Sequence, residues 1–167
     1  MSACFNSMPR ISLLRAAAVL SAGISLLAAA NSTASPHIVE SFDATTWTHL
    51  QQELPRPAVV VFTATYCASC PALLARMATE LQERGLKTPI VAVVIDEADR
   101  HELLTSEHYR LASRLFAFDG NEASLRYEVD PRWRGITPYV ALLPAQGKTV
   151  FVSGTPTDEQ LSVWSRK

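Results

Sequence analysis

The sequence of 167 residues has no internal repeat, no low-complexity tract and no linker-like segment that could join two domains. These absences exclude repeat architectures and favour a single domain. Hydrophobic residues make up 48% of the chain, which is ample for one core. Excess basic charge is also missing, because residues 35–167 carry a net charge of about −3 once two N-terminal arginines are set aside. That charge argues against a nucleic-acid partner.

The N-terminal segment has the pattern of a secretory signal. Arg10 and Arg15 precede an uncharged apolar run over residues 16–30, and small residues follow it. We therefore predict that residues 1–34 are a cleaved signal peptide and that residues 35–167 form an exported, periplasmic domain.

The cleavage site and the alternative to cleavage follow from the same segment. Two small-x-small patterns place cleavage before Asn31 or Ser35. An uncleaved membrane anchor is the alternative, although the apolar run is marginal for the ~20 residues that span a bilayer. No cysteine follows the run, which argues against a lipid anchor. After cleavage we expect no stable membrane insertion.

Cysteine is scarce, with three in the chain, and cleavage would remove Cys4 and leave Cys67 and Cys70. A zinc site needs about four ligands, and the mature chain offers neither a second cysteine pair nor clustered histidines, so we predict no metal site. A disulfide that closes only four residues constrains the unfolded chain little. A redox couple is the favoured interpretation, and inert packing cysteines are the remaining alternative.

The elements around the cysteines form a strand, a helix and a second strand. The run 58–64 is continuously β-branched or aromatic, as in a strand covered on both faces. An apolar stripe from Leu73 to Leu81 predicts a helix that Gly85 ends. The run 89–96 predicts a second buried strand, parallel to the first.

The remaining segments predict further helices and a hairpin on either side of this unit. Residues 42–54 have helical spacing with Asp43 as a cap, and residues 98–118 are mixed and partly helical. Residues 139–154 predict an antiparallel hairpin, and the pattern TDEQ at 157–160 is a capping box that opens a last helix. The predicted fold class is α/β, with a central mixed β-sheet flanked by helices.

The spacing of the cysteines suits exchange chemistry. Cys67 is expected at the turn that leaves the strand and Cys70 three residues into the following helix, so that their sulfurs lie on one face. Free N–H groups at a helix N-terminus stabilise a thiolate on Cys67 and lower its pKa towards ambient pH. Cys70, one turn deeper, is more shielded and suits a resolving role.

Two segments resemble the thioredoxin superfamily, and within it the exported TlpA/ResA-like proteins. They are VVVFTATYCASC at 59–70 and RGITPYVALLPAQGKTVFVSGTPTDEQL at 134–161. The resemblance implies a thioredoxin-like fold, a redox-active Cys67–Cys70 pair and no cofactor. It also implies a cis Thr137–Pro138 bond beside Cys67, with Tyr66, Thr137 and Pro138 contacting the substrate, whose extended chain would pair with the Thr137 backbone.

Several positions depart from the family pattern. Val61 and Leu73 stand where relatives carry a buried carboxylate, and Ala75 replaces a helix proline. Asp96 and Glu97, after the second strand, are possible proton acceptors for Cys70, but the favoured interpretation is that they only end the strand. Trp133 could line the substrate groove or simply pack.

The favoured function is an exported thiol–disulfide oxidoreductase that exchanges disulfides with other exported proteins, more in the direction of a reductant. By resemblance, its partners would be exported protein thiols or disulfides and a membrane electron donor. Two alternatives remain: a metallochaperone that holds Cu(I) between the two thiolates, and a partner-binding module in which the cysteines are secondary.

Overall fold

The computed structural model describes residues 35–166 of the chain. The predicted signal peptide and its cleavage sites lie outside the described residues. Within residues 35–166, no helix is long and apolar enough to cross a membrane.

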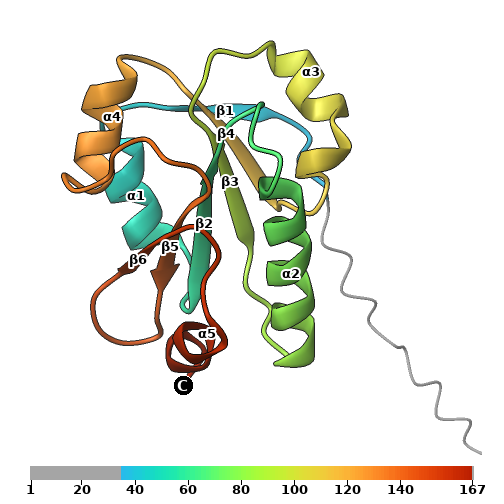
Figure 1. The fold of residues 1–167 in the computed structure, drawn as a ribbon, viewed down its shortest axis with the longest axis vertical. Helices are drawn as coiled ribbons and strands as arrows, with labels where there is room; N and C mark the ends of the chain where they lie inside the picture. Colours follow the sequence, from blue (N-terminus) through green and yellow to red (C-terminus); the bar gives the residue numbers. More distant parts are fainter. Residues whose placement is uncertain (1–34, 167) are drawn as a thin grey trace, which may run out of the picture. The chain divides into compact units, whose positions relative to one another are not determined.

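A six-stranded mixed sheet forms the centre of the fold (Figure 1). Its spatial order is β1-β4-β3-β2-β5-β6, with parallel pairing from β1 to β2 and antiparallel pairing from β2 to β6. Every residue of β2, β3 and β5 is buried, which explains their continuous apolar sequences. The strands are β1 (Val39–Phe42), β2 (Ala58–Thr63), β3 (Ile90–Val94), β4 (Arg114–Phe118), β5 (Tyr139–Leu143) and β6 (Val150–Ser153).

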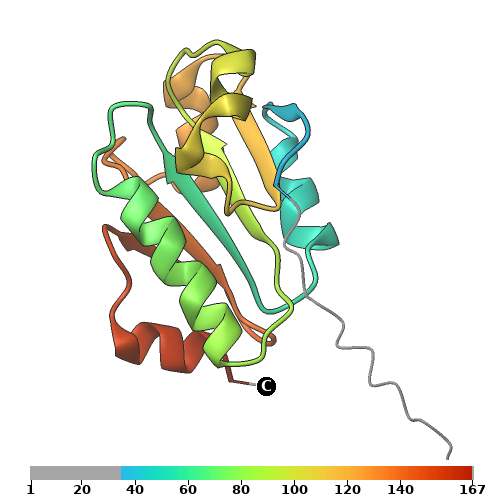
Figure 2. The ribbon, with the colours of Figure 1, turned by 90° about the vertical axis from the view of Figure 1, so that its right-hand side faces the viewer.

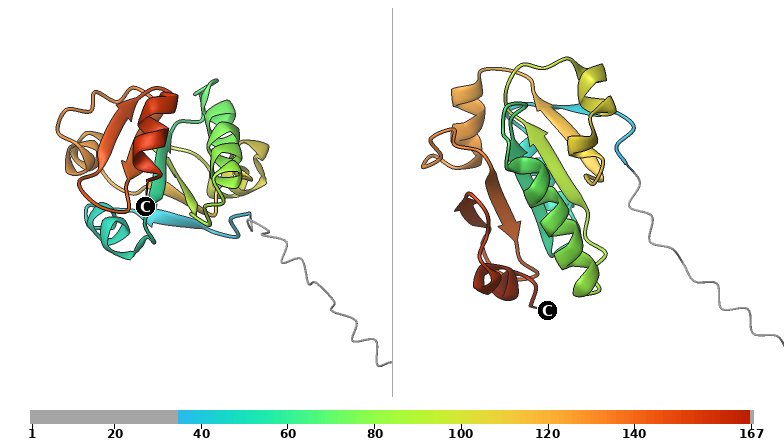
Figure 3. Two further views of the ribbon diagram at one scale, coloured as in Figure 1. Left: turned by 90° about the horizontal axis from the view of Figure 1, so that it is seen from below. Right: turned by 45° about the vertical axis from the view of Figure 1, so that its right-hand side comes forward.

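Helices cover both faces of the sheet. Trp47 and Leu50 of α1 and Val129 of α4 join one apolar cluster with Phe62. The buried residues of α2 from Leu73 onward, together with those of α3 and α5, join a second cluster with Val61 on the opposite face. Figures 2 and 3 show α2 lying along its face of the sheet, with α5 beside it. The helices are α1 (Thr46–Glu53), α2 (Cys70–Glu83), α3 (Arg100–Thr105), α4 (Glu122–Val129) and α5 (Asp158–Trp164), with a 3-10 turn at Glu107–Tyr109.

This architecture confirms the predicted fold class and most of its elements. The strands predicted at 58–64 and 89–96 are the parallel neighbours β2 and β3. The predicted hairpin is β5 with β6, and the TDEQ pattern forms a complete capping box at the start of α5. Gly85 follows α2 with φ +62°, a conformation that suits glycine.

Two strands of the sheet and one of the helices packed on it differ from the sequence-based expectation. Phe42 was expected in a helix, but it ends the edge strand β1. The expected cap is displaced as well: Thr45 is the N-cap residue of α1, and the Asp43 carboxylate accepts the N–H groups of Thr45 and Thr46. The mixed segment 98–118 contains a strand, β4, which inserts between β1 and β3. Helix α4 was not predicted, because only two of its eight residues are buried and the apolar stripe is short.

Polar links connect α2 to α5 near the end of the fold that is remote from the cysteines. Arg76 of α2 donates to the carbonyl of Pro156 at 2.8 Å and to the Asp158 carboxylate at 2.6 Å. Arg84 donates to the hydroxyl of Ser165, just after α5, at 2.9 Å. These bonds hold α5 beside α2 from the middle of α2 to its C-terminal end.

Candidate active site

Two tight turns carry the chain from β2 into α2. The N–H of Cys67 donates to the carbonyl of Ala64 at 3.0 Å, and the N–H of Cys70 donates to the carbonyl of Cys67 at 3.2 Å. Cys70 is therefore the first residue of α2, with Pro71 in the first turn, where its missing N–H costs nothing. The expectation that Cys70 lies a full turn inside the helix was wrong, because the two turns use up the intervening residues.

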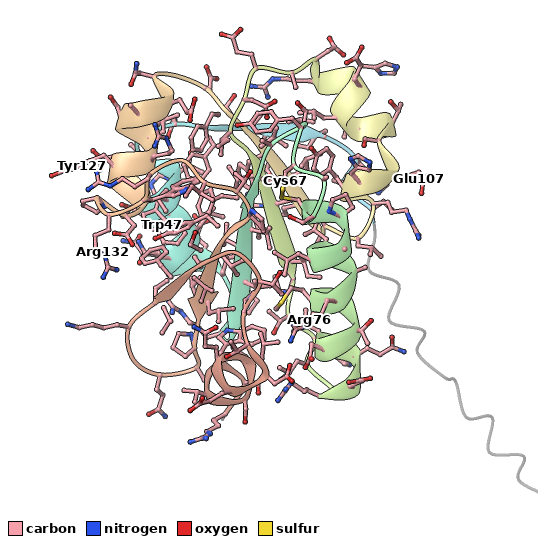
Figure 4. The ribbon with its side chains drawn as sticks, viewed as in Figure 1. Trp47, Cys67, Arg76, Glu107, Tyr127 and Arg132 are labelled. Atoms are coloured by element: carbon pink, nitrogen blue, oxygen red, sulfur yellow. A yellow bond between two sulfur atoms is a disulfide. The ribbon has the colours of Figure 1, made fainter. Side chains whose placement is uncertain are left out.

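Cys67 and Cys70 form a disulfide. Their Cα atoms are 5.5 Å apart, a separation typical of disulfides, so the backbone needs no rearrangement to bring the sulfurs together. Cys67 is 8% exposed and Cys70 is 2% exposed. Figure 4 shows Cys67 beside the start of α2. Of the two, Cys67 is the sulfur that an incoming group can reach.

Ser69 occupies the N-cap position of α2, but its side chain does not cap the helix. Its hydroxyl instead lies 3.9 Å from the Sγ of Cys67. Because a disulfide sulfur carries no hydrogen, the Ser69 hydroxyl is the donor in this contact. After reduction the same hydroxyl would face a Cys67 thiolate, where a charge-assisted hydrogen bond is stronger.

Asp96 anchors the loop that leads to Cys67. One carboxylate oxygen accepts the N–H of Thr65 at 2.9 Å and the other accepts the Thr65 hydroxyl. Asp96 therefore ties the end of β3 to the loop after β2, a role that the sequence did not suggest. Glu97 is exposed, and Leu73 is buried in an apolar cluster.

The loop before β5 meets the same end of the sheet. Tyr139 pairs with Phe62 in the antiparallel ladder, so Pro138 lies where β2 gives way to the turn that carries Cys67. The Thr137–Pro138 peptide bond is cis. Pro138 is buried and its carbonyl accepts the N–H of Gly154 at 2.8 Å. Within residues 35–166, neither the N–H nor the C=O of Thr137 has a hydrogen-bond partner, so both are available to a bound chain.

Two exposed apolar side chains flank the site in sequence. Tyr66, just before Cys67, is 73% exposed, and Ile136, just before Thr137, is 63% exposed. Both belong to the loops that meet at this end of the sheet. Exposed apolar side chains beside a reactive group offer contact area to a partner.

Trp133 packs in the core and does not line a groove. It is 5% exposed, its indole N–H donates to the carbonyl of Ile136 at 3.0 Å, and its ring stacks on Tyr139 with centroids 4.7 Å apart. Of the two roles that the sequence left open for Trp133, the structure therefore assigns packing.

Asp130 is a polar residue of this region that the sequence analysis missed. It is 4% exposed, and its carboxylate accepts hydrogen bonds from Arg132 and Tyr139. Those bonds, chiefly from the Arg132 side chain, lower the pKa of Asp130 to about 2. The described residues contain no group of three or more histidine, cysteine or acidic side chains that could hold a metal ion.

The arrangement combines a cysteine pair at the start of a helix that follows a buried strand, a proline at the start of an antiparallel strand, and a closing hairpin and helix. These are the features that the two resembling segments imply. The fold is thioredoxin-like. Strand β4 stands between β1 and β3 in this sheet.

No protein-family model matches the chain, and no curated protein matches it. Among solved structures, it is similar to a thio-disulfide isomerase from Thermus thermophilus (22% identity, TM-score 0.47, covering 67% of this chain and 78% of that one). It is also similar to a secreted Mycobacterium tuberculosis disulfide oxidoreductase homologous to E. coli DsbE (20%, TM-score 0.44, covering 64% and 77%). A third is M. tuberculosis DsbF (15%, TM-score 0.49, covering 69% and 85%). These identities and TM-scores are too low to assign the function of any of these proteins to this chain.

Proposed function

We propose that the protein is an exported thiol–disulfide oxidoreductase that acts as a reductant on disulfides of other exported proteins. The observation that carries this proposal is the Cys67–Cys70 disulfide at the start of α2, with Cys67 as the more exposed sulfur. The N-terminal sequence pattern supports export through a signal peptide.

Each cysteine has a separate role in the reaction. In the reduced protein, the Cys67 thiolate attacks one sulfur of a substrate disulfide, forms a mixed disulfide and releases the other substrate sulfur as a thiolate. The Cys70 thiolate then attacks the Sγ of Cys67, which restores the Cys67–Cys70 disulfide and releases the second substrate thiolate. Two electrons pass to the substrate, and a membrane-bound dithiol donor returns them.

The surroundings of the disulfide support binding of an extended substrate. The free N–H and C=O groups of Thr137 can pair with the backbone on one side of a substrate cysteine, as in strand addition. Tyr66 offers an exposed aromatic face next to Cys67.

Replacing Cys70 with serine tests the mechanism. Without the resolving thiol, the C70S variant should accumulate partners as mixed disulfides on Cys67, and dithiothreitol should release them. The C67S variant is the matched control and should trap no partners. A partner-binding module would give the same partners with both variants, whether or not reductant is present, and that result would reject the proposal.

The direction of exchange is tested by the reduction potential of the purified protein against dithiothreitol or glutathione buffers. A reduction potential of about −270 mV supports a reductant, and a potential of about −120 mV identifies an oxidant. Tight 1:1 binding of Cu(I), lost with either cysteine and without reversible disulfide formation, would favour a metallochaperone instead.

A further inference from the structure

A buried carboxylate closes the base of the loop that carries Thr137 and Pro138. Asp130, which follows α4, lies at one end of this loop, and Tyr139, the first residue of β5, lies at the other. The Tyr139 hydroxyl donates to Asp130 Oδ2 at 2.7 Å, and both residues are buried. One hydrogen bond therefore joins the two ends of the loop.

The same carboxylate holds the first residues of the loop. The backbone N–H of Arg132 donates to Asp130 Oδ1 at 3.0 Å, and the Arg132 guanidinium contacts both carboxylate oxygens at 3.1 Å. The backbone N–H of Trp133 donates to the carbonyl of Asp130 at 2.9 Å. Figure 4 shows Arg132 on the side of the molecule that carries α4.

Trp133 extends this network to the residues that precede the proline. Its indole N–H holds the carbonyl of Ile136, and its ring lies flat on Tyr139, with 5° between the planes, and against Phe62 of β2, with centroids 5.0 Å apart. The loop is thus bound at its start, at its end and just before Thr137. Thr137 itself keeps a free backbone.

The protonation states of the network suit holding the loop rather than proton transfer. Arg132 and Tyr139 keep the pKa of Asp130 near 2, and burial together with the bond to Asp130 raises the pKa of Tyr139. At neutral pH the acceptor is therefore charged and the donor protonated, which is the strong form of this hydrogen bond. None of the hydrogen bonds in the network reaches Cys67 or Cys70.

We infer that Asp130 is a positioning residue for substrate binding: through Tyr139 and Trp133 it holds the backbone of Ile136 to Pro138 in the conformation that receives the substrate chain. This inference rests on the proposed function. It assigns Asp130 to the docking of a protein substrate and not to the reactivity of the cysteines. A small thiol, which does not need the loop, should be insensitive to Asp130.

The Tyr139→Phe variant tests this separation, because it removes one hydroxyl without changing the ring stack. With insulin as a model protein disulfide and dithiothreitol as the reductant, its KM for insulin should rise about three- to tenfold, the range expected for one buried hydrogen bond. Its kcat, and its rate of direct exchange with dithiothreitol, should stay within about twofold of the parent. Tyr127→Phe is the matched control, because Tyr127 is 65% exposed on α4, and it should behave as the parent.

Two Asp130 variants complete the test. Asp130→Asn keeps an acceptor for the Tyr139 hydroxyl, so its KM should lie between those of the parent and Tyr139→Phe. Asp130→Ala should raise KM the most. Near-ultraviolet circular dichroism checks that each variant is folded, and Tyr139→Phe retains the test if Asp130→Ala does not fold.

The outcomes separate this inference from the proposed function. An unchanged KM in folded Tyr139→Phe overturns the positioning role, and so does an equal loss of insulin reduction and dithiothreitol exchange. If the parent protein itself fails to reduce insulin or any other protein disulfide, while it exchanges with dithiothreitol, the proposed function fails first.

Discussion

The Ser69 hydroxyl has two possible hydrogen-bond partners, an N–H at the start of α2 and the sulfur of Cys67. As the N-cap residue it could accept an N–H of α2, yet its hydroxyl lies against Cys67 instead. The helix loses the stabilisation of a side-chain cap, typically ~1 kcal/mol. In the reduced protein, the Ser69 hydroxyl would offer a hydrogen bond to a Cys67 thiolate close to the N-terminus of α2, which also favours negative charge.

We predict that Ser69→Ala slows alkylation of reduced Cys67 by iodoacetamide at pH 7 by about twofold. Loss of a hydrogen bond worth ~0.5–1 kcal/mol lowers the thiolate fraction, and the higher intrinsic nucleophilicity of the remaining thiolate offsets about half of that effect. Ser69→Thr keeps the hydroxyl and should react at the parent rate. An equal slowing in both variants would show that the hydroxyl does not act on the sulfur.

At the scale of the elements, two features favour glycine at position 135 in the loop between α4 and β5: a positive φ and the close approach of a side chain. Gly135 has φ +82°, and a Cβ at this position would lie 2.9 Å from the guanidinium of Arg126 on α4. That guanidinium also pairs with Glu122 at 3.1 Å. The hairpin glycine, Gly147, has a similar φ of +97°, but a Cβ there would meet nothing within 4 Å.

This contrast gives a matched pair of substitutions. Gly147→Ala should lower the free energy of unfolding by about 1 kcal/mol through the unfavourable φ alone. Gly135→Ala should lower it by about 2 kcal/mol, because Arg126 must also move away from Glu122. Urea unfolding measures both. Equal losses would mean that Arg126 moves without cost.

At the scale of the whole molecule, Asp130 makes the free energy of unfolding depend on pH in the acidic range. Its pKa is about 2 in the folded chain, below the ordinary aspartate value of 3.8, so the folded state favours the charged form. A carboxyl whose pKa is lowered by folding contributes stability above its unfolded pKa and loses that contribution as the pH falls through the folded value. Because the Arg132 side chain is 82% exposed, solvent screens its interaction with Asp130 and reduces this contribution.

We predict that the stability difference between the parent and Asp130→Asn is largest above pH 5 and shrinks by about 1–2 kcal/mol as the pH falls from 4 to 2. Urea unfolding of both proteins at a series of pH values provides the measurement. A difference that stays constant across this range would show that Asp130 is not held in its charged form by folding.

The local part of this fold could be predicted from the sequence. Continuous β-branched runs predicted β2 and β3, an apolar stripe predicted α2, and the capping box predicted α5. The cysteine pair was recognisable because its position between a buried strand and a helix is itself a local pattern. Each of these signals depends on residues close together in the chain, where periodicity and capping act.

Only the tertiary structure decided which distant segments support the site. β1 and β4 are strands because β1 pairs with β4 and β4 pairs in turn with β3, whereas their own short sequences do not require a strand. Asp130 and Tyr139 are nine positions apart, and their hydrogen bond forms only because the sheet places β5 beside β2. The cysteine pair is a property of the sequence, whereas the geometry of the loop that we propose to receive a substrate comes from long-range packing.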